Sequence, residues 1–207
     1  DRLASDFEGA AGEAAVSDGV EAPRDERAVP SHGGDPTALG SAFHAACQWL
    51  IELDRADLPV ERADALCRYW GCTAAQRERF DEAVARWLSS DVRAEALAWP
   101  CVRAEVPFYS LGMDGLVERF GPYAEGAIDL LCTDPARPGR ALLIDYKTGG
   151  SPLETPEQLQ EKHALQASVY ADVLHKAGYE RVTLKFVRVE VPDPADPVQP
   201  QVVTYEL

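Results

Sequence analysis

A short apolar run that ends in a charged turn limits the possible folds of this chain more than any other feature. Ala141-Leu142-Leu143-Ile144 is followed directly by Asp145-Tyr146-Lys147-Thr148-Gly149-Gly150. Four consecutive apolar residues predict a strand that is buried on both faces. Side chains two positions apart share one face of a strand, so we expect Asp145 and Lys147 to lie side by side at its end. Burying two charges there is costly unless they are paired or have a function.

A second acid interrupts the preceding apolar segment. Residues 125–132 predict a strand that carries Asp129, and the turn-rich residues 134–139 connect it to the strand that ends in Asp145. The two acids are therefore expected on neighbouring antiparallel strands. Two nearby carboxylates repel each other, and a divalent cation removes this repulsion. Carboxylate oxygens favour Mg²⁺ or Mn²⁺.

The remaining patterns predict helices first and strands later. Asp35 is expected to cap a first helix with Pro36 at its first position, and Thr73 and Thr155 each begin a capping box. The apolar periodicity predicts helices over 36–53, 59–70, 73–89, 91–99 and 155–177, and strands over 101–111, 113–120, 182–191 and 198–206.

Charge divides the chain into two parts. Residues 1–36 contain nine acidic and three basic residues, which predicts an acidic linker or tether. Residues 37–207 then form one domain, with a helical part over about 37–99 and a sheet core over about 100–207. The net charge of −15 argues against a protein that holds nucleic acid by charge alone.

Other features point to a cytoplasmic protein. The five cysteines are odd in number and scattered, which favours reduced thiols in a cytosolic interior. No apolar run is long enough to cross a membrane. Because the chain begins at Asp1 without methionine, we expect a fragment of a larger protein.

Two interpretations of the charged strand end stay open on these residues alone. Asp145 and Lys147 could form a plain salt bridge while Asp129 caps a turn, since surface pairs of this kind are common. Alternatively, Asp129 and Asp145 bind a metal and Lys147 faces a phosphate, with the lysine held apart from Asp145. A metal beside a lysine is the minimum equipment for hydrolysing a phosphodiester.

The motifs taken together resemble the PD-(D/E)xK nuclease superfamily, and within it the C-terminal nuclease domains of RecB/AddA-type helicase–nucleases. The resemblance covers about residues 35–207 and rests on five motifs in the family's order. These motifs are Gly40-x-x-x-His44, Glu105-Val106-Pro107-Phe108, Gly126-x-Ile128-Asp129, Asp145-Tyr146-Lys147-Thr148-Gly149 and Gln166-x-x-x-Tyr170.

The resemblance implies a fold and a role for each matching residue. The fold is an α/β (α+β) restriction-endonuclease-like core, in which helices flank a central mixed sheet, with an inserted helical region over residues 53–99. Lys147 would be the catalytic lysine, Gln166 and Tyr170 would support the site and the DNA strand, and Glu105 would be an accessory acid. The implied metal ligands are His44, Asp129, Asp145 and the backbone carbonyl of Tyr146.

The implied activity is Mg²⁺-dependent exonucleolytic hydrolysis of DNA, with Mn²⁺ as a possible substitute. Single-stranded DNA would be delivered by a helicase portion of the same polypeptide, with a second subunit as a further partner, in double-strand-break repair and recombination. One branch of the family carries a four-cysteine iron–sulfur cluster, but no cysteine precedes Cys47 or follows Cys132, so we expect no cluster. The alternatives are a catalytically silent module that binds DNA or a subunit, and a stand-alone RecB-like or restriction-type nuclease.

Overall fold

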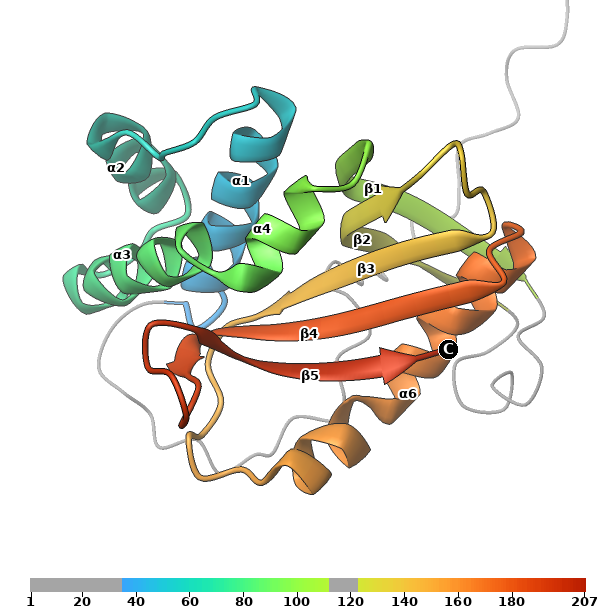
Figure 1. Cartoon of the computed structure of the whole chain (residues 1–207). Coiled ribbons are helices and arrows are strands. Elements are labelled where there is room, and N and C mark those ends of the chain that lie inside the picture. The colour runs from blue at the N-terminus through green and yellow to red at the C-terminus, as the bar shows by residue number, and fades with distance from the viewer. Residues whose placement is uncertain (1–34, 112–122) are drawn as a thin grey trace, which may run out of the picture.

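The computed structural model describes residues 35–111 and 123–207, and its helices pack on a single mixed sheet (Figure 1). Residues 1–34 of the linker predicted over 1–36, and the strand predicted over 113–120, lie outside the described residues. The described helices are α1 (Ala38–Glu52), α2 (Val60–Tyr69), α3 (Ala74–Leu88), α4 (Asp91–Leu97) and α6 (Pro156–Lys176). The described strands are β1 (Cys101–Leu111), β2 (Tyr123–Thr133), β3 (Arg140–Lys147), β4 (Arg181–Pro192) and β5 (Pro200–Glu206).

The five strands are arranged in chain order, β1-β2-β3-β4-β5. β3 and β4 are parallel, and every other neighbouring pair is antiparallel. The parallel pair needs a crossover connection, which α6 supplies between β3 and β4. This mixed sheet with flanking helices confirms the predicted restriction-endonuclease-like α/β fold.

Two hydrophobic cores lie on opposite faces of the sheet. Leu142, Ile144 and Tyr146 of β3 pack with residues of α1, α2 and α3, whereas Ala141 and Leu143 pack with residues of α6. This alternation along β3 is the two-residue periodicity of a strand, and both faces are covered as predicted. In Figure 1, α1–α4 lie together on one side of the sheet and α6 lies on the other.

The helix boundaries follow the local sequence signals, with one exception. Both predicted capping boxes are present, at Thr73 with Gln76 and at Thr155 with Gln158. The prediction that Asp35 caps α1 is wrong, because α1 begins at Ala38 and Thr37 occupies the N-cap position. The Asp35 carboxylate instead accepts a 2.9 Å hydrogen bond from the backbone N–H of Thr37 and closes a turn ahead of the helix.

None of the helices in the described part of the chain is both long and apolar enough to cross a membrane.

Candidate active site

The candidate site forms where β2 and β3 separate. Their backbone pairing runs from Thr133–Ala141 to Leu130–Ile144 and ends there. One residue further on, the Asp129 carboxylate takes the place of a backbone acceptor, because its Oδ2 accepts a 2.6 Å hydrogen bond from the backbone N–H of Tyr146. The Asp129 carboxylate therefore lies between two diverging strands.

Glu105 on β1 enters the site through an unusual backbone conformation. Its φ is +48°, in the left-handed region that residues other than glycine rarely adopt. The flanking pairs Ala104–Leu130 and Val106–Ile128 are regular, so the distortion is confined to one position opposite Asp129. A conformation of this kind costs on the order of 1–3 kcal/mol and is concentrated at functional sites.

His44 comes to these two acids from α1. Its Nδ1 lies 3.2 Å from Asp129 Oδ1 and 3.7 Å from Glu105 Oε1. The imidazole also meets the Tyr146 ring edge-on, with 5.7 Å between the ring centroids. His44 is therefore held by an aromatic contact and by two carboxylates from two different strands.

Gly40, one turn before His44, lets α1 approach the segment that follows β3. A Cβ atom at position 40 would lie 2.9 Å from Thr148 Oγ1, which is closer than real Cβ contacts allow. The glycine of the Gly40-x-x-x-His44 motif therefore has a packing reason. It brings the helix that carries His44 against the strand end that carries Lys147.

Asp145 is held by the two polar residues of α6. Its Oδ2 accepts hydrogen bonds from Gln166 Nε2 at 2.9 Å and from the Tyr170 hydroxyl at 2.8 Å. Gln166 Nε2 also lies 3.2 Å from the Tyr170 hydroxyl. The spacing of one helical turn brings both donors to one carboxylate oxygen, as expected for residues four apart. These contacts orient the Asp145 carboxylate, and the predicted role of Gln166 and Tyr170 in supporting the site and the DNA strand stays a prediction.

Lys147 is not held apart from Asp145. Its Nζ lies 2.7 Å from Asp145 Oδ1, which corrects the expectation of a lysine that is free of this carboxylate. The physical reason is burial, because Asp145 is 3% exposed and a buried carboxylate is stabilised by the nearest cation. Oδ1 accepts no hydrogen bond of good angle, so the attraction to Lys147 is that of an ion pair, which has no angular requirement.

Two further residues surround Lys147 that the sequence did not assign to the site. Lys147 Nζ lies 5.3 Å from the centroid of the Phe186 ring, and His163 stacks on the same ring with centroids 4.6 Å apart. Phe186 is on β4 opposite Asp145 in the parallel register. Only the pairing of β3 with β4 reveals this neighbour, whereas His163 is one of the buried residues of α6.

Two polar residues of β4 hold the segment that follows Lys147. Arg188, which is 2% exposed, donates hydrogen bonds to the Ser151 carbonyl at 2.9 Å and to Glu154 Oε2 at 2.6 Å. The Glu190 carboxylate accepts a hydrogen bond from the backbone N–H of Gly149. The loop between β3 and α6 is thereby fixed to the sheet, which limits the motion of the Lys147 end.

The pKa values of the site depend on burial and on neighbouring charges. Burial lowers the pKa of His44, but Asp129 and then Glu105 outweigh it and hold that pKa well above its ordinary value. Burial raises the pKa of Asp129, His44 opposes the rise, and the charge of Asp145 adds to it. Burial, followed by the charge of Asp145, raises the pKa of Tyr170 well above its ordinary value, so the hydroxyl remains a donor.

The donor atoms present suit a divalent cation. One ligand atom each from His44, Glu105 and Asp129 lies within 4.8 Å of the others. Asp145 contributes a buried Oδ1 that accepts no hydrogen bond, although it lies outside that group of three. Carboxylates with one imidazole are acceptable ligands for Mg²⁺ or Mn²⁺. Glu105 thus joins the metal-binding candidates, while its predicted role as an accessory acid and the predicted roles of Asp145 and the Tyr146 carbonyl as ligands stay predictions.

Comparison with known families agrees with this geometry. The model of the PD-(D/E)XK nuclease superfamily matches residues 16–206, which is most of the chain. The chain belongs to the PD-(D/E)XK nuclease superfamily. Members of this superfamily are phosphodiester-cleaving nucleases that typically use a divalent metal, and a DNA substrate follows from membership. No curated protein matches the chain significantly.

Proposed function

We propose that this chain is the metal-dependent DNA exonuclease domain of a RecB/AddA-like helicase–nuclease that acts in double-strand-break repair and recombination. The observation that carries the proposal is the meeting of His44, Glu105, Asp129, Asp145 and Lys147 at the diverging ends of β2 and β3. Superfamily membership supports phosphodiester hydrolysis as the chemistry.

His44, Glu105 and Asp129, together with Asp145, would hold the cation, with Mg²⁺ as the expected ion and Mn²⁺ as a substitute. A bound divalent cation lowers the pKa of a water molecule and neutralises charge on phosphate oxygens. Hydrolysis of this kind needs no nucleophilic side chain, because water is the nucleophile.

Lys147 supplies the positive charge that the protein itself contributes. Its ammonium group orients the attacking water and stabilises the charge that develops on the phosphate oxygens. In the structure the ammonium already lies between Asp145 Oδ1 and the Phe186 ring. Gln166 and Tyr170 fix the other oxygen of Asp145, so that the carboxylate keeps its orientation while Lys147 turns towards the scissile phosphate.

The acidic charge of the chain fits a module that cuts DNA and does not hold it alone. With a net charge of −15, most of the affinity for single-stranded DNA would come from the helicase portion and a second subunit.

End-labelled single-stranded DNA tests the proposal, with separate 5′ and 3′ labels and with Mg²⁺ present or absent. We expect Mg²⁺-dependent shortening from an end. Asp145→Ala and Lys147→Ala should each lower the rate by at least about a hundredfold, since each removes a charged group from the reacting centre.

Matched controls are Asp57→Ala and Lys176→Ala, which remove the same charges from exposed positions on the loop after α1 and on α6. Circular dichroism establishes that every variant is folded. Cleavage at the wild-type rate in folded Asp145→Ala or Lys147→Ala would contradict the proposal.

A further inference from the structure

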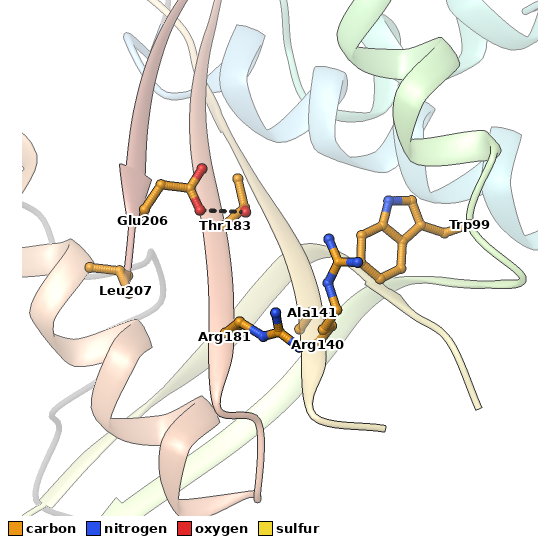
Figure 2. A pocket seen from close by; sticks show the side chains of 7 residues that line it. All are labelled: Trp99, Arg140, Ala141, Arg181, Thr183, Glu206 and Leu207. Carbon is orange, nitrogen blue, oxygen red and sulfur yellow. Dashed lines mark hydrogen bonds between the residues drawn. The ribbon is translucent and has the colours of Figure 1, made fainter. Parts of the chain in front are cut away.

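A cavity of about 350 Å³ lies at the end of the sheet opposite Lys147, where β3 and β4 begin (Figure 2). Arg140 and Arg181 line it and occupy the same register on the two parallel strands. Trp99, Thr183 and Glu206 contribute to the wall. Arg140 and Lys147 are seven residues apart on β3, or roughly 23 Å at the usual rise of a strand, so the cavity is separate from the candidate active site.

The two arginines of this cavity are not neutralised by ion pairing. Across residues 35–111 and 123–207, no ion pair or side-chain hydrogen bond engages the guanidinium of Arg140 or Arg181. The charge of Arg140 reaches Asp134 and contributes to lowering the pKa of that carboxyl, although Arg137 and then the backbone N–H of Ala136 contribute more. Neighbouring strands are about 4.8 Å apart, so two like charges at one register repel each other unless an anion joins them.

The acid that lines the same cavity has another partner. Glu206 Oε2 accepts a 2.8 Å hydrogen bond from the Thr183 hydroxyl. In Figure 2, Glu206 and Thr183 face each other on β5 and β4, while Arg140 extends towards the Trp99 ring and Arg181 points from β4 towards Arg140. The cavity therefore combines two arginine side chains from neighbouring strands, an indole ring and a separate polar pair.

We propose that this cavity binds the phosphate group of a nucleotide. Guanidinium groups match phosphate oxygens in a bidentate geometry, and two of them together offset its charge. The half-buried Trp99 ring offers a surface on which a base can stack. The volume is within the range of small-ligand pockets.

A phosphate group bound in this cavity can come from two sources in a nuclease. It can belong to a strand whose end lies in the active site, or to a free nucleotide. The choice of a nucleotide as ligand rests on the proposed function, whereas the anion site itself rests on Arg140 and Arg181.

Calorimetric titration of the full chain without divalent metal tests the proposal, because no cleavage then occurs. The probes are inorganic phosphate, dAMP and a single strand of about 20 nucleotides. Arg140→Gln/Arg181→Gln should weaken binding by at least about tenfold, as expected for loss of charged hydrogen bonds. Arg140→Lys/Arg181→Lys keeps the charge but loses the bidentate geometry, and it should recover binding only in part. Trp99→Leu should weaken the binding of dAMP more than the binding of inorganic phosphate.

The control Arg55→Gln/Arg68→Gln removes two charges from exposed positions on the helical side and should bind all three probes as the wild type does. If Arg140→Gln/Arg181→Gln loses affinity only for the single strand, the ligand is a phosphate within DNA. If it loses affinity equally for dAMP, the ligand is a free nucleotide. Unchanged affinity for every probe in Arg140→Gln/Arg181→Gln, or the same loss in the control, would overturn the proposal. Absence of Mg²⁺-dependent cleavage in the separate assay would instead count against the nuclease function.

Discussion

Glu105 is the residue whose backbone conformation most needs an explanation. A glutamate at φ +48° in the middle of β1 is less favourable than a glycine there, because its Cβ crowds the following carbonyl oxygen. Its carboxylate is one of the two that meet at His44, together with that of Asp129. We interpret the conformation as strain that is retained because it aims the carboxylate at the metal-binding residues.

Comparing Glu105→Gly with Glu105→Ala tests this interpretation. Both variants lack the carboxylate, but only alanine keeps the crowded Cβ. We expect the glycine variant to be more stable than the alanine variant by about 1 kcal/mol, measured by urea unfolding. Equal stability of the two, or a more stable alanine variant, would mean that position 105 stores no strain.

The sequence alone identified Asp129 and Asp145, because an acid inside or at the end of an apolar strand stands out. It could not show that Glu105 is a metal-binding candidate, since this depends on a backbone φ angle and on contacts with two other elements. It also could not show that Lys147 pairs with Asp145, because two side chains on one face have several rotamers. The expectation of a free lysine failed for this reason.

The contact between α1 and the segment after β3 sets the position of His44 relative to Lys147. Gly40 and Thr148 are the residues at this contact. Alanine is the better helix former by about 1 kcal/mol, so glycine inside α1 is a cost that the close approach explains.

The effect of Gly40→Ala on the free energy of unfolding should therefore change sign with the residue at position 148. In the wild-type background the new Cβ meets Thr148 Oγ1, and we expect a loss of about 1–3 kcal/mol of stability from overpacking. In a Thr148→Ala background the obstructing oxygen is gone, and the same substitution should be neutral or stabilising. Thermal or urea unfolding of the wild type, the two single variants and the double variant measures the coupling between positions 40 and 148. The same change in stability for Gly40→Ala in both backgrounds would contradict the importance of this contact.

At the scale of elements, local signals predicted most of the fold. The capping boxes marked the starts of α3 and α6, and the turn-rich residues after β2 correctly indicated an antiparallel hairpin with β3. Pairing of β3 with β4 joins segments separated by a whole helix, so no local pattern reports its register. Phe186 escaped notice as a neighbour of Lys147 for the same reason.

The stability of the whole molecule should depend on pH through His163, which is 8% exposed. Burial, followed by the charge of Lys147, lowers the pKa of His163 from 6.5 to about 4. Below pH 6.5 this histidine is therefore protonated in the unfolded chain. In the folded chain it stays neutral until the pH falls to about 4. Stability from the neutral imidazole is present above pH 6.5 and is lost as the pH falls to about 4, by at most about 3 kcal/mol.

His163→Phe keeps the aromatic stack on Phe186 but has no group to titrate. Urea unfolding at pH 7.5, 6 and 5 should show a smaller loss of stability in this variant than in the wild type. Parallel pH profiles for the two proteins would show that His163 is not held neutral in the folded state.

Titration of Mn²⁺ into the full chain by calorimetry tests most directly whether His44, Glu105, Asp129 and Asp145 form a metal site. We predict one saturable site in the wild type. Its affinity should fall by at least about a hundredfold in Asp129→Asn, which removes a charged donor from the centre of the group. Asp57→Asn, at an exposed position, should leave the affinity unchanged. Wild-type affinity in folded Asp129→Asn would contradict the assignment of the site.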